Sequence, residues 1–86
     1  VGASALLLML AQQADLTPGE LIWMGGDVHL YLNHFEQARE QVSRTPTPFP
    51  KMRLVRKAGS IDDYRIEDFE VSGYAPQAAI KADVAV

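Results

Sequence analysis

GGDVHLYLNH, residues 25–34, lies where a predicted strand passes into a predicted helix. Successive side chains of a strand point to opposite faces, so His29 and Tyr31 should share one face and Leu30 should take the other. The two polar rings would then stand about 7 Å apart along the strand. An imidazole and a phenol at that separation can converge on one hydroxyl group, each as donor or acceptor. This geometry suits a sugar hydroxyl, and the alternative is that both rings serve only packing.

Upstream of this segment, the sequence predicts a helix at Ser4–Ala14 and a strand at Glu20–Tyr31. The helix is rich in Leu, Met, Ala and Gln, which favour helices, and it is apolar on nearly every side before Gln12. We therefore expect it to be buried. Trp23, in the predicted strand, is expected in the core. Between the two elements, adjacent Pro and Gly in Asp15–Gly19 break both regular patterns and predict a turn.

Downstream of the segment, the predicted elements are short. A helix is expected at His34–Val42, with Asn33 and Glu36 spaced as a capping box. His34 is then expected to be a surface or capping residue of the first turn. Alternating prolines at 46, 48 and 50 predict an extended connector. The remaining predictions are strands at Lys51–Arg56 and Phe69–Tyr74 and a helical turn at Ser60–Tyr64 capped by Ser60.

Composition limits the class of protein and says little about its chemistry. The 86 residues suffice for one small α/β (α+β) domain, residues 1–86 without an internal boundary, and the 48% hydrophobic content argues against disorder. A net charge of −3 gives no reason to expect binding to nucleic acid or to an anionic membrane. The apolar opening is too short to span a bilayer. The chain contains no cysteine, which excludes a thiolate nucleophile within it, and its acidic residues lack a metal-ligand spacing, so we predict no metal site.

Residues 25–34 resemble the pattern Gly-Gly-Asp-x-His-x-Tyr-x-Asn-His of thymidylate synthases, and the resemblance extends over essentially the whole chain. Further matches in the same order are Ala11-Gln12-Gln13, Leu21-Ile22-Trp23, Gln41 with Ser43-Arg44, the alternating prolines, Asp63-Tyr64-Arg65, Glu67-Asp68-Phe69-Glu70, Gly73-Tyr74, and Ile80-Lys81-Ala82 with Val84-Ala85. In one departure, Asp83 stands where the family has a proline.

The resemblance implies the C-terminal portion of the thymidylate synthase fold, with a long buried helix, strands of a mixed sheet and short helices. It implies a cytoplasmic homodimer that converts dUMP to dTMP with methylene-tetrahydrofolate as cosubstrate. It assigns His29 and Tyr31 to the deoxyribose hydroxyl of the nucleotide. It assigns Val84, Ala85 and Val86 to a lid that closes over the folate.

In the family, the nucleophilic cysteine, the phosphate-binding arginines and the catalytic aspartate precede the region matched here. We therefore expect the 86 residues to be inactive alone and to need the N-terminal part of the enzyme. One alternative is a truncated or degenerate module without catalysis that associates with itself. A second is a fragment of a deoxycytidylate hydroxymethylase, because the residue that separates uracil from cytosine also lies upstream.

Overall fold

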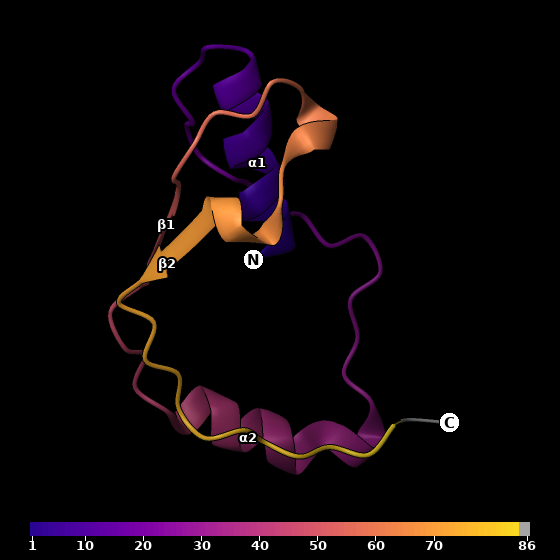
Figure 1. Cartoon of the computed structure of the whole chain (residues 1–86). Coiled ribbons are helices and arrows are strands. Elements are labelled where there is room, and N and C mark those ends of the chain that lie inside the picture. The colour runs from indigo at the N-terminus through magenta and orange to yellow at the C-terminus, as the bar shows by residue number, and fades with distance from the viewer. Residues whose placement is uncertain (85–86) are drawn as a thin grey trace. The chain divides into compact units, whose positions relative to one another are not determined.

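The structure is a computed structural model that describes residues 1–84, and its contacts divide the chain into two compact units. Unit 1 consists of Val1–Trp23 and Phe49–Tyr74, and unit 2 consists of Met24–Pro48 and the residues from Ala75 onward. Each unit is therefore built from two stretches of chain that are distant in sequence. Figure 1 labels the α-helices and strands of both units.

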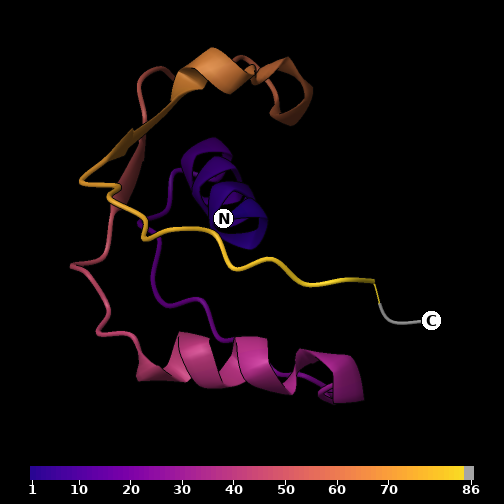
Figure 2. The same cartoon turned by 90° about the horizontal axis from the view of Figure 1, so that it is seen from below.

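Unit 1 places helix α1 (Gly2–Gln13) against a two-stranded antiparallel sheet and a short turn of 3₁₀-helix. Strands β1 (Lys51–Leu54) and β2 (Phe69–Ser72) pair in a register that sets Lys51 opposite Ser72 and Leu54 opposite Phe69. The connection between them contains two 3₁₀-helices, η2 (Ile61–Asp63) and η3 (Ile66–Asp68). Figures 1 and 2 show α1 beside the two strands from two directions.

Helix α1 confirms the predicted helix and ends in a Schellman motif. Asp15 takes a left-handed φ of 55°, the amide of Leu16 donates to the Ala11 carbonyl at 2.8 Å, and the amide of Asp15 donates to Gln12 at 3.3 Å. These bonds satisfy carbonyls that the helix end would otherwise leave unpaired. Aspartate tolerates this backbone conformation better than most residues do. The turn that the sequence predicts at Asp15–Gly19 therefore begins at its first residue.

The predicted burial of this helix is found only in part. Ala11 is its one buried residue, whereas Leu6 and Leu10 are half exposed. Trp23, expected in the core, is 77% exposed, so that expectation is wrong for the described chain. The physical reason is a shortage of partners, because β1 and η2 are the main elements in contact with α1 among residues 1–84.

Unit 2 contains the 3₁₀-helix η1 (Leu32–His34), which leads directly into helix α2 (Phe35–Ser43). The predicted capping box is wrong, because Asn33 lies inside η1 and His34 takes the N-cap position without a side-chain cap. The predicted strand at Glu20–Tyr31 is also wrong, because the sheet found among the described residues contains only β1 and β2. A strand needs a neighbour to bond its amides and carbonyls, and no such neighbour is present for residues 20–31 in this part of the chain.

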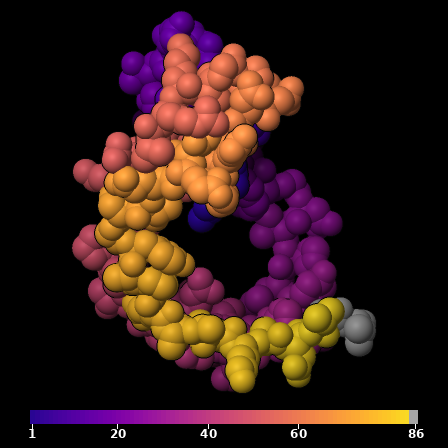
Figure 3. All heavy atoms as spheres, in the orientation of Figure 1, coloured from indigo at the N-terminus to yellow at the C-terminus, as the bar shows by residue number. Residues whose placement is uncertain are grey.

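The segment 75–84, here called the tail, runs antiparallel to α2. Hydrogen bonds join the tail to η1, to α2 and to the proline-rich connector that follows α2. They pair residue 75 with 47, 77 with 45, 78 with 44, 81 with 37 and 83 with 34. In Figure 3 the atoms of the tail lie over those of α2. Across both units, none of the described helices is long and apolar enough to cross a membrane.

Candidate functional site

The backbone around His29 and Tyr31 brings their rings together without the help of a sheet. A bend at Gly26 and Asp27 precedes an extended stretch that leads to η1. The ring centroids of His29 and Tyr31 lie 4.8 Å apart, with planes inclined at 71°. The edge of one ring therefore meets the face of the other, a favourable arrangement for aromatic pairs. The expected proximity is present, while the role of the pair in binding stays a prediction.

Asp27 lies beside one of the two ring nitrogens of His29. The Nδ1 atom of His29 lies 3.4 Å from Oδ1 of Asp27, a long contact in which the carboxylate can only accept. The tautomer that suits this contact carries its proton on Nδ1 and leaves Nε2 as an acceptor. The side chain of His29 is 52% exposed, so Nε2 is accessible to an incoming hydroxyl.

Tyr31 supplies the complementary group. The residue is 51% exposed, and its phenol can donate a hydrogen bond as well as accept one. A sugar hydroxyl offers one proton and two lone pairs. It therefore needs one acceptor and one donor as partners. The pair of His29 and Tyr31 thus offers an acceptor and a donor at half-exposed positions.

His34 joins this pair to the tail, which the sequence analysis did not foresee. Its ring centroid lies 5.8 Å from that of Tyr31, again edge to face at 81°. Its Nε2 atom lies 2.6 Å from the carbonyl oxygen of Asp83. The partners are 49 positions apart, and no local pattern in the sequence signals a contact of that separation.

The residues predicted to form a lid follow this contact in the chain. Val84 is strongly exposed. Ala85 and Val86 lie outside the described residues. The lid assignment of all three therefore stays a prediction.

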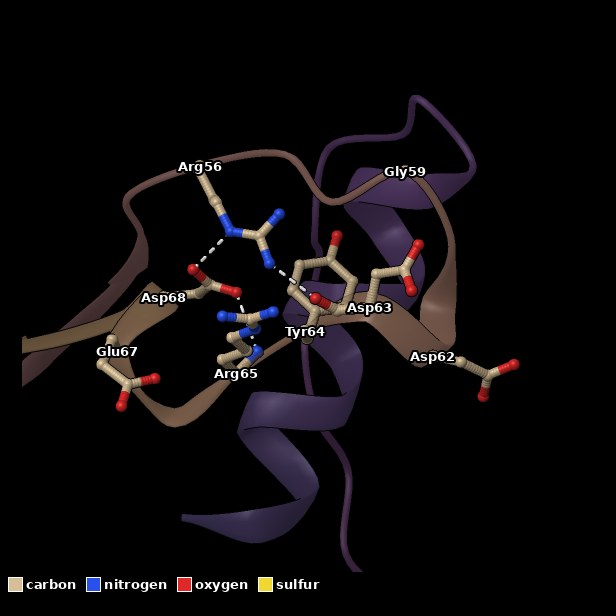
Figure 4. A pocket seen from close by; sticks show the side chains of 8 residues that line it. All are labelled: Arg56, Gly59, Asp62, Asp63, Tyr64, Arg65, Glu67 and Asp68. Carbon is tan, nitrogen blue, oxygen red and sulfur yellow. Dashed lines mark hydrogen bonds and ion pairs between the residues drawn. The ribbon is translucent and has the colours of Figure 1, made fainter.

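A cavity of about 700 Å³ in unit 1 is lined by charged groups, several of which already have partners. Nε of Arg56 donates to Oδ1 of Asp68 at 2.6 Å, and Nη2 of Arg56 donates to the Asp63 carbonyl at 2.5 Å (Figure 4). The other carboxylate oxygen of Asp68 accepts from the Arg65 amide at 2.8 Å. Asp68 is only 5% exposed. The hydrogen bond from Arg56, followed by that from the Arg65 amide, holds the pKa of Asp68 below its ordinary value.

The charges that line this cavity indicate that its residues stabilise the fold and do not bind an anion. Its lining carries two arginines and four carboxylates, so it has an excess of negative charge and would not attract a phosphate. The side chains of Asp62 and Glu67 point away from Arg56 in Figure 4. Within residues 1–84, no group of three or more His, Cys, Asp or Glu side chains could hold a metal ion.

The hydroxyl of Tyr64 in unit 1 also has hydrogen-bond partners within the fold. The hydroxyl of Tyr64 donates to Oε1 of Gln12 at 2.5 Å and accepts from Nε2 of Gln13 at 3.0 Å. Gln13 also donates to the Ala58 carbonyl at 2.8 Å. These bonds tie the end of α1 to η2 and its approach. Tyr64 therefore has its hydrogen bonds within the fold.

Comparison with known proteins places the chain among relatives of one kind. The family model described as thymidylate synthase matches residues 1–86. The thymidylate synthase of Rhodopseudomonas palustris is 79% identical over 84 residues, which are 98% of this chain and 28% of that protein. Those of Cereibacter sphaeroides and Zymomonas mobilis are 71% and 55% identical over 86 residues, all of this chain and 29% of each protein. The chain thus spans 28–29% of the length of these relatives.

Proposed function

The chain belongs to the thymidylate synthase family, and we propose that it forms the C-terminal part of an enzyme that methylates dUMP to dTMP. The cosubstrate is methylene-tetrahydrofolate, and the complete enzyme is a cytoplasmic homodimer. The match over residues 1–86 and the 79% identity to a named thymidylate synthase support the proposal. The identity favours this reaction over that of a deoxycytidylate hydroxymethylase.

The role of this chain in the reaction is to hold the deoxyribose of the nucleotide. The observation that carries this role is the edge-to-face pair of His29 and Tyr31, both half exposed, with centroids 4.8 Å apart. Nε2 of His29 accepts the proton of the sugar hydroxyl, and Tyr31 donates its own proton to the hydroxyl oxygen. Such bonds fix the sugar, and thereby the pyrimidine ring, before the chemical step.

The chemical step itself requires groups from the rest of the polypeptide. Covalent catalysis of this type needs an activated thiolate, and these 86 residues include no cysteine. The isolated chain is therefore inactive, and it works only as part of the complete enzyme. Residues 84–86 close over the bound folate and exclude water from the site.

The non-catalytic alternative is distinguished by a measurement on the complete polypeptide. Formation of dTMP from dUMP and methylene-tetrahydrofolate supports the enzyme. If the complete polypeptide binds dUMP and folate yet forms no dTMP, the module has lost its catalytic function.

The sugar contact is tested by the affinity of the complete polypeptide for dUMP, measured by calorimetry. A net hydrogen bond contributes about 0.5–1.5 kcal/mol, so Tyr31→Phe and His29→Ala should each weaken dUMP binding roughly 3- to 10-fold. Tyr64→Phe provides a matched control, because it removes the same atom from a tyrosine whose hydroxyl bonds to Gln12 and Gln13.

The control should lose stability and keep its dUMP affinity. The free energy of unfolding should fall by about 1–2 kcal/mol, since two glutamine side chains lose their partner. Equal dUMP affinities for the wild type, Tyr31→Phe and His29→Ala would rule out the proposed sugar site.

A further inference from the structure

The tail is held against η1–α2 through its backbone carbonyls. Nη1 of Arg44 donates to the Ala78 carbonyl at 2.7 Å, Nε2 of Gln37 to that of Lys81 at 3.2 Å, and His34 bonds that of Asp83 at 2.6 Å. These donors lie on one side of α2 and its approach, and they are less exposed than the charged residues Glu36 and Arg39. Contacts of this kind fix the path of the tail without reading its side chains.

The contact at His34 has a defined chemical form. A carbonyl oxygen carries no proton, so Nε2 of His34 must be the donor. The neutral ring protonated at Nε2 and the imidazolium both provide this donor. His34 can therefore hold the Asp83 carbonyl in either protonation state, and no proton is transferred.

The same imidazole contacts Tyr31, one of the two proposed sugar ligands. The rings of Tyr31 and His34 meet edge to face at 5.8 Å, and those of His29 and Tyr31 meet at 4.8 Å. Three rings thus lead from the sugar contacts to the carbonyl of Asp83. The proposed lid residues 84–86 begin at the next position in the chain.

We propose that His34 is a positioning residue that attaches the tail at the Asp83 carbonyl and so sets where the lid begins relative to Tyr31. The proposal rests on the function proposed above for residues 29, 31 and 84–86. His34 does not touch a reacting atom. It acts through the tail, so it should govern the KM for folate more than kcat or the affinity for dUMP.

The attachment itself is tested without any assay of activity. In the complete polypeptide, His34→Leu removes the donor, whereas His34→Gln retains an amide N–H that can reach a carbonyl. Cleavage by trypsin after Lys81, followed by mass spectrometry, reports release of the tail. We expect His34→Leu to accelerate this cleavage roughly 3- to 10-fold, the loss of about one hydrogen bond, and His34→Gln to restore much of the protection.

Two controls separate release of the tail from general unfolding. Cleavage after Lys57, in unit 1, should proceed at the wild-type rate in every variant. Gln41→Leu makes a similar polar-to-apolar change at an exposed position of α2, and it should leave cleavage after Lys81 unchanged. If His34→Leu leaves that cleavage unchanged as well, the attachment does not exist and the proposal is overturned.

The positioning role is tested by steady-state kinetics of the same variants. We expect His34→Leu to raise the KM for methylene-tetrahydrofolate roughly 3- to 10-fold, with a smaller change in the dissociation constant of dUMP, and His34→Gln to recover. Faster cleavage after Lys81 with an unchanged folate KM would overturn the positioning role. If the wild-type polypeptide neither binds dUMP nor forms dTMP, the proposed function is refuted, and the positioning role with it. The trypsin experiment still decides whether His34 attaches the tail.

Discussion

Tyr64 of unit 1 and Tyr31 of unit 2 show how differently the two units use the same kind of side chain. The hydroxyl of Tyr64 is bonded to Gln12 and Gln13. Tyr31 is half exposed. Its ring contacts are His29 and His34. A polar group that is already satisfied stabilises the fold, whereas an accessible one is available to a ligand.

The same contrast holds for the charged and titratable groups. In unit 1, Arg56 and Asp68 bond to each other, and Asp68 is almost completely buried. In unit 2, His34 and Arg44 bond to backbone carbonyls of the tail. In unit 1, Arg56 thus holds a buried carboxylate of the fold, whereas in unit 2 His34 and Arg44 hold the tail. Three changes test this distinction.

The largest effect is expected from Arg56→Leu. It leaves the buried carboxylate of Asp68 without its charged partner, which is strongly destabilising. We expect the melting temperature of the complete polypeptide to fall by roughly 5 °C or more, with unchanged dUMP affinity. Arg53→Leu is the matched control, because its bidentate pair with Glu70 is exposed. Exposed pairs contribute little, so a loss as large as that of Arg56→Leu would contradict the distinction.

A moderate effect is expected from acid. The pKa of Asp68 is lowered in the folded chain, first by the hydrogen bond from Arg56. A group with a lowered folded-state pKa stabilises the fold above its unfolded pKa, and this contribution disappears as the pH falls through the folded-state value. The stability that Asp68 contributes should thus be complete above about pH 5 and decrease below about pH 4. Urea unfolding between pH 3 and 6 measures the free energy of unfolding at each pH. In Arg56→Leu this free energy should change less with pH than in the wild type. An equal dependence on pH in both proteins would refute the attribution to Asp68.

The smallest effect is expected from Asp83→Pro, which restores the family's residue. Proline keeps the carbonyl that His34 bonds and reduces the freedom of the unbound tail. We expect the KM for folate to fall by about 1.5- to 5-fold, equivalent to a few tenths to about 1 kcal/mol. Steady-state kinetics of the complete polypeptide measure it, and an unchanged folate KM would show that Asp83 does not loosen the tail.

Local signals in the sequence predicted the elements of unit 1 well. The helix at Ser4–Ala14 is found at Gly2–Gln13, and the strands at Lys51–Arg56 and Phe69–Tyr74 are found as β1 and β2, each two residues shorter. Ser60 caps η2, since its Oγ accepts from the Asp62 amide at 3.3 Å. These features depend on neighbouring residues. Helix propensity, alternation and a capping hydroxyl are all visible in a short window of sequence.

Features that depend on distant residues were not predicted. The strand expected at Glu20–Tyr31 has no partner strand among residues 1–84. Arg56 bonds to Asp68 and Lys57 bonds to Asp15, which lie 12 and 42 positions away in the sequence. The tail lies along α2 through bonds that join positions 28–49 apart. No periodicity encodes such pairs, because they depend on how the chain folds back.

The candidate site shows the same division. The sequence predicted that His29 and Tyr31 would lie together, because they are two positions apart. The third ring, His34, was predicted only as a surface or capping residue. Its contact with Asp83 appears only when the tail is placed beside α2.

The proposed contact of His29 and Tyr31 with the sugar hydroxyl can be measured with an analogue of dUMP that lacks the 3′-hydroxyl, dideoxyuridine monophosphate. The affinities of the complete polypeptide for dUMP and for this analogue are compared. The wild type should prefer dUMP roughly 10- to 100-fold, for two hydrogen bonds, and Tyr31→Phe should lose roughly 3- to 10-fold of that preference. An equal preference in the wild type and in Tyr31→Phe would show that Tyr31 does not contact this hydroxyl, and the account of the site would be wrong.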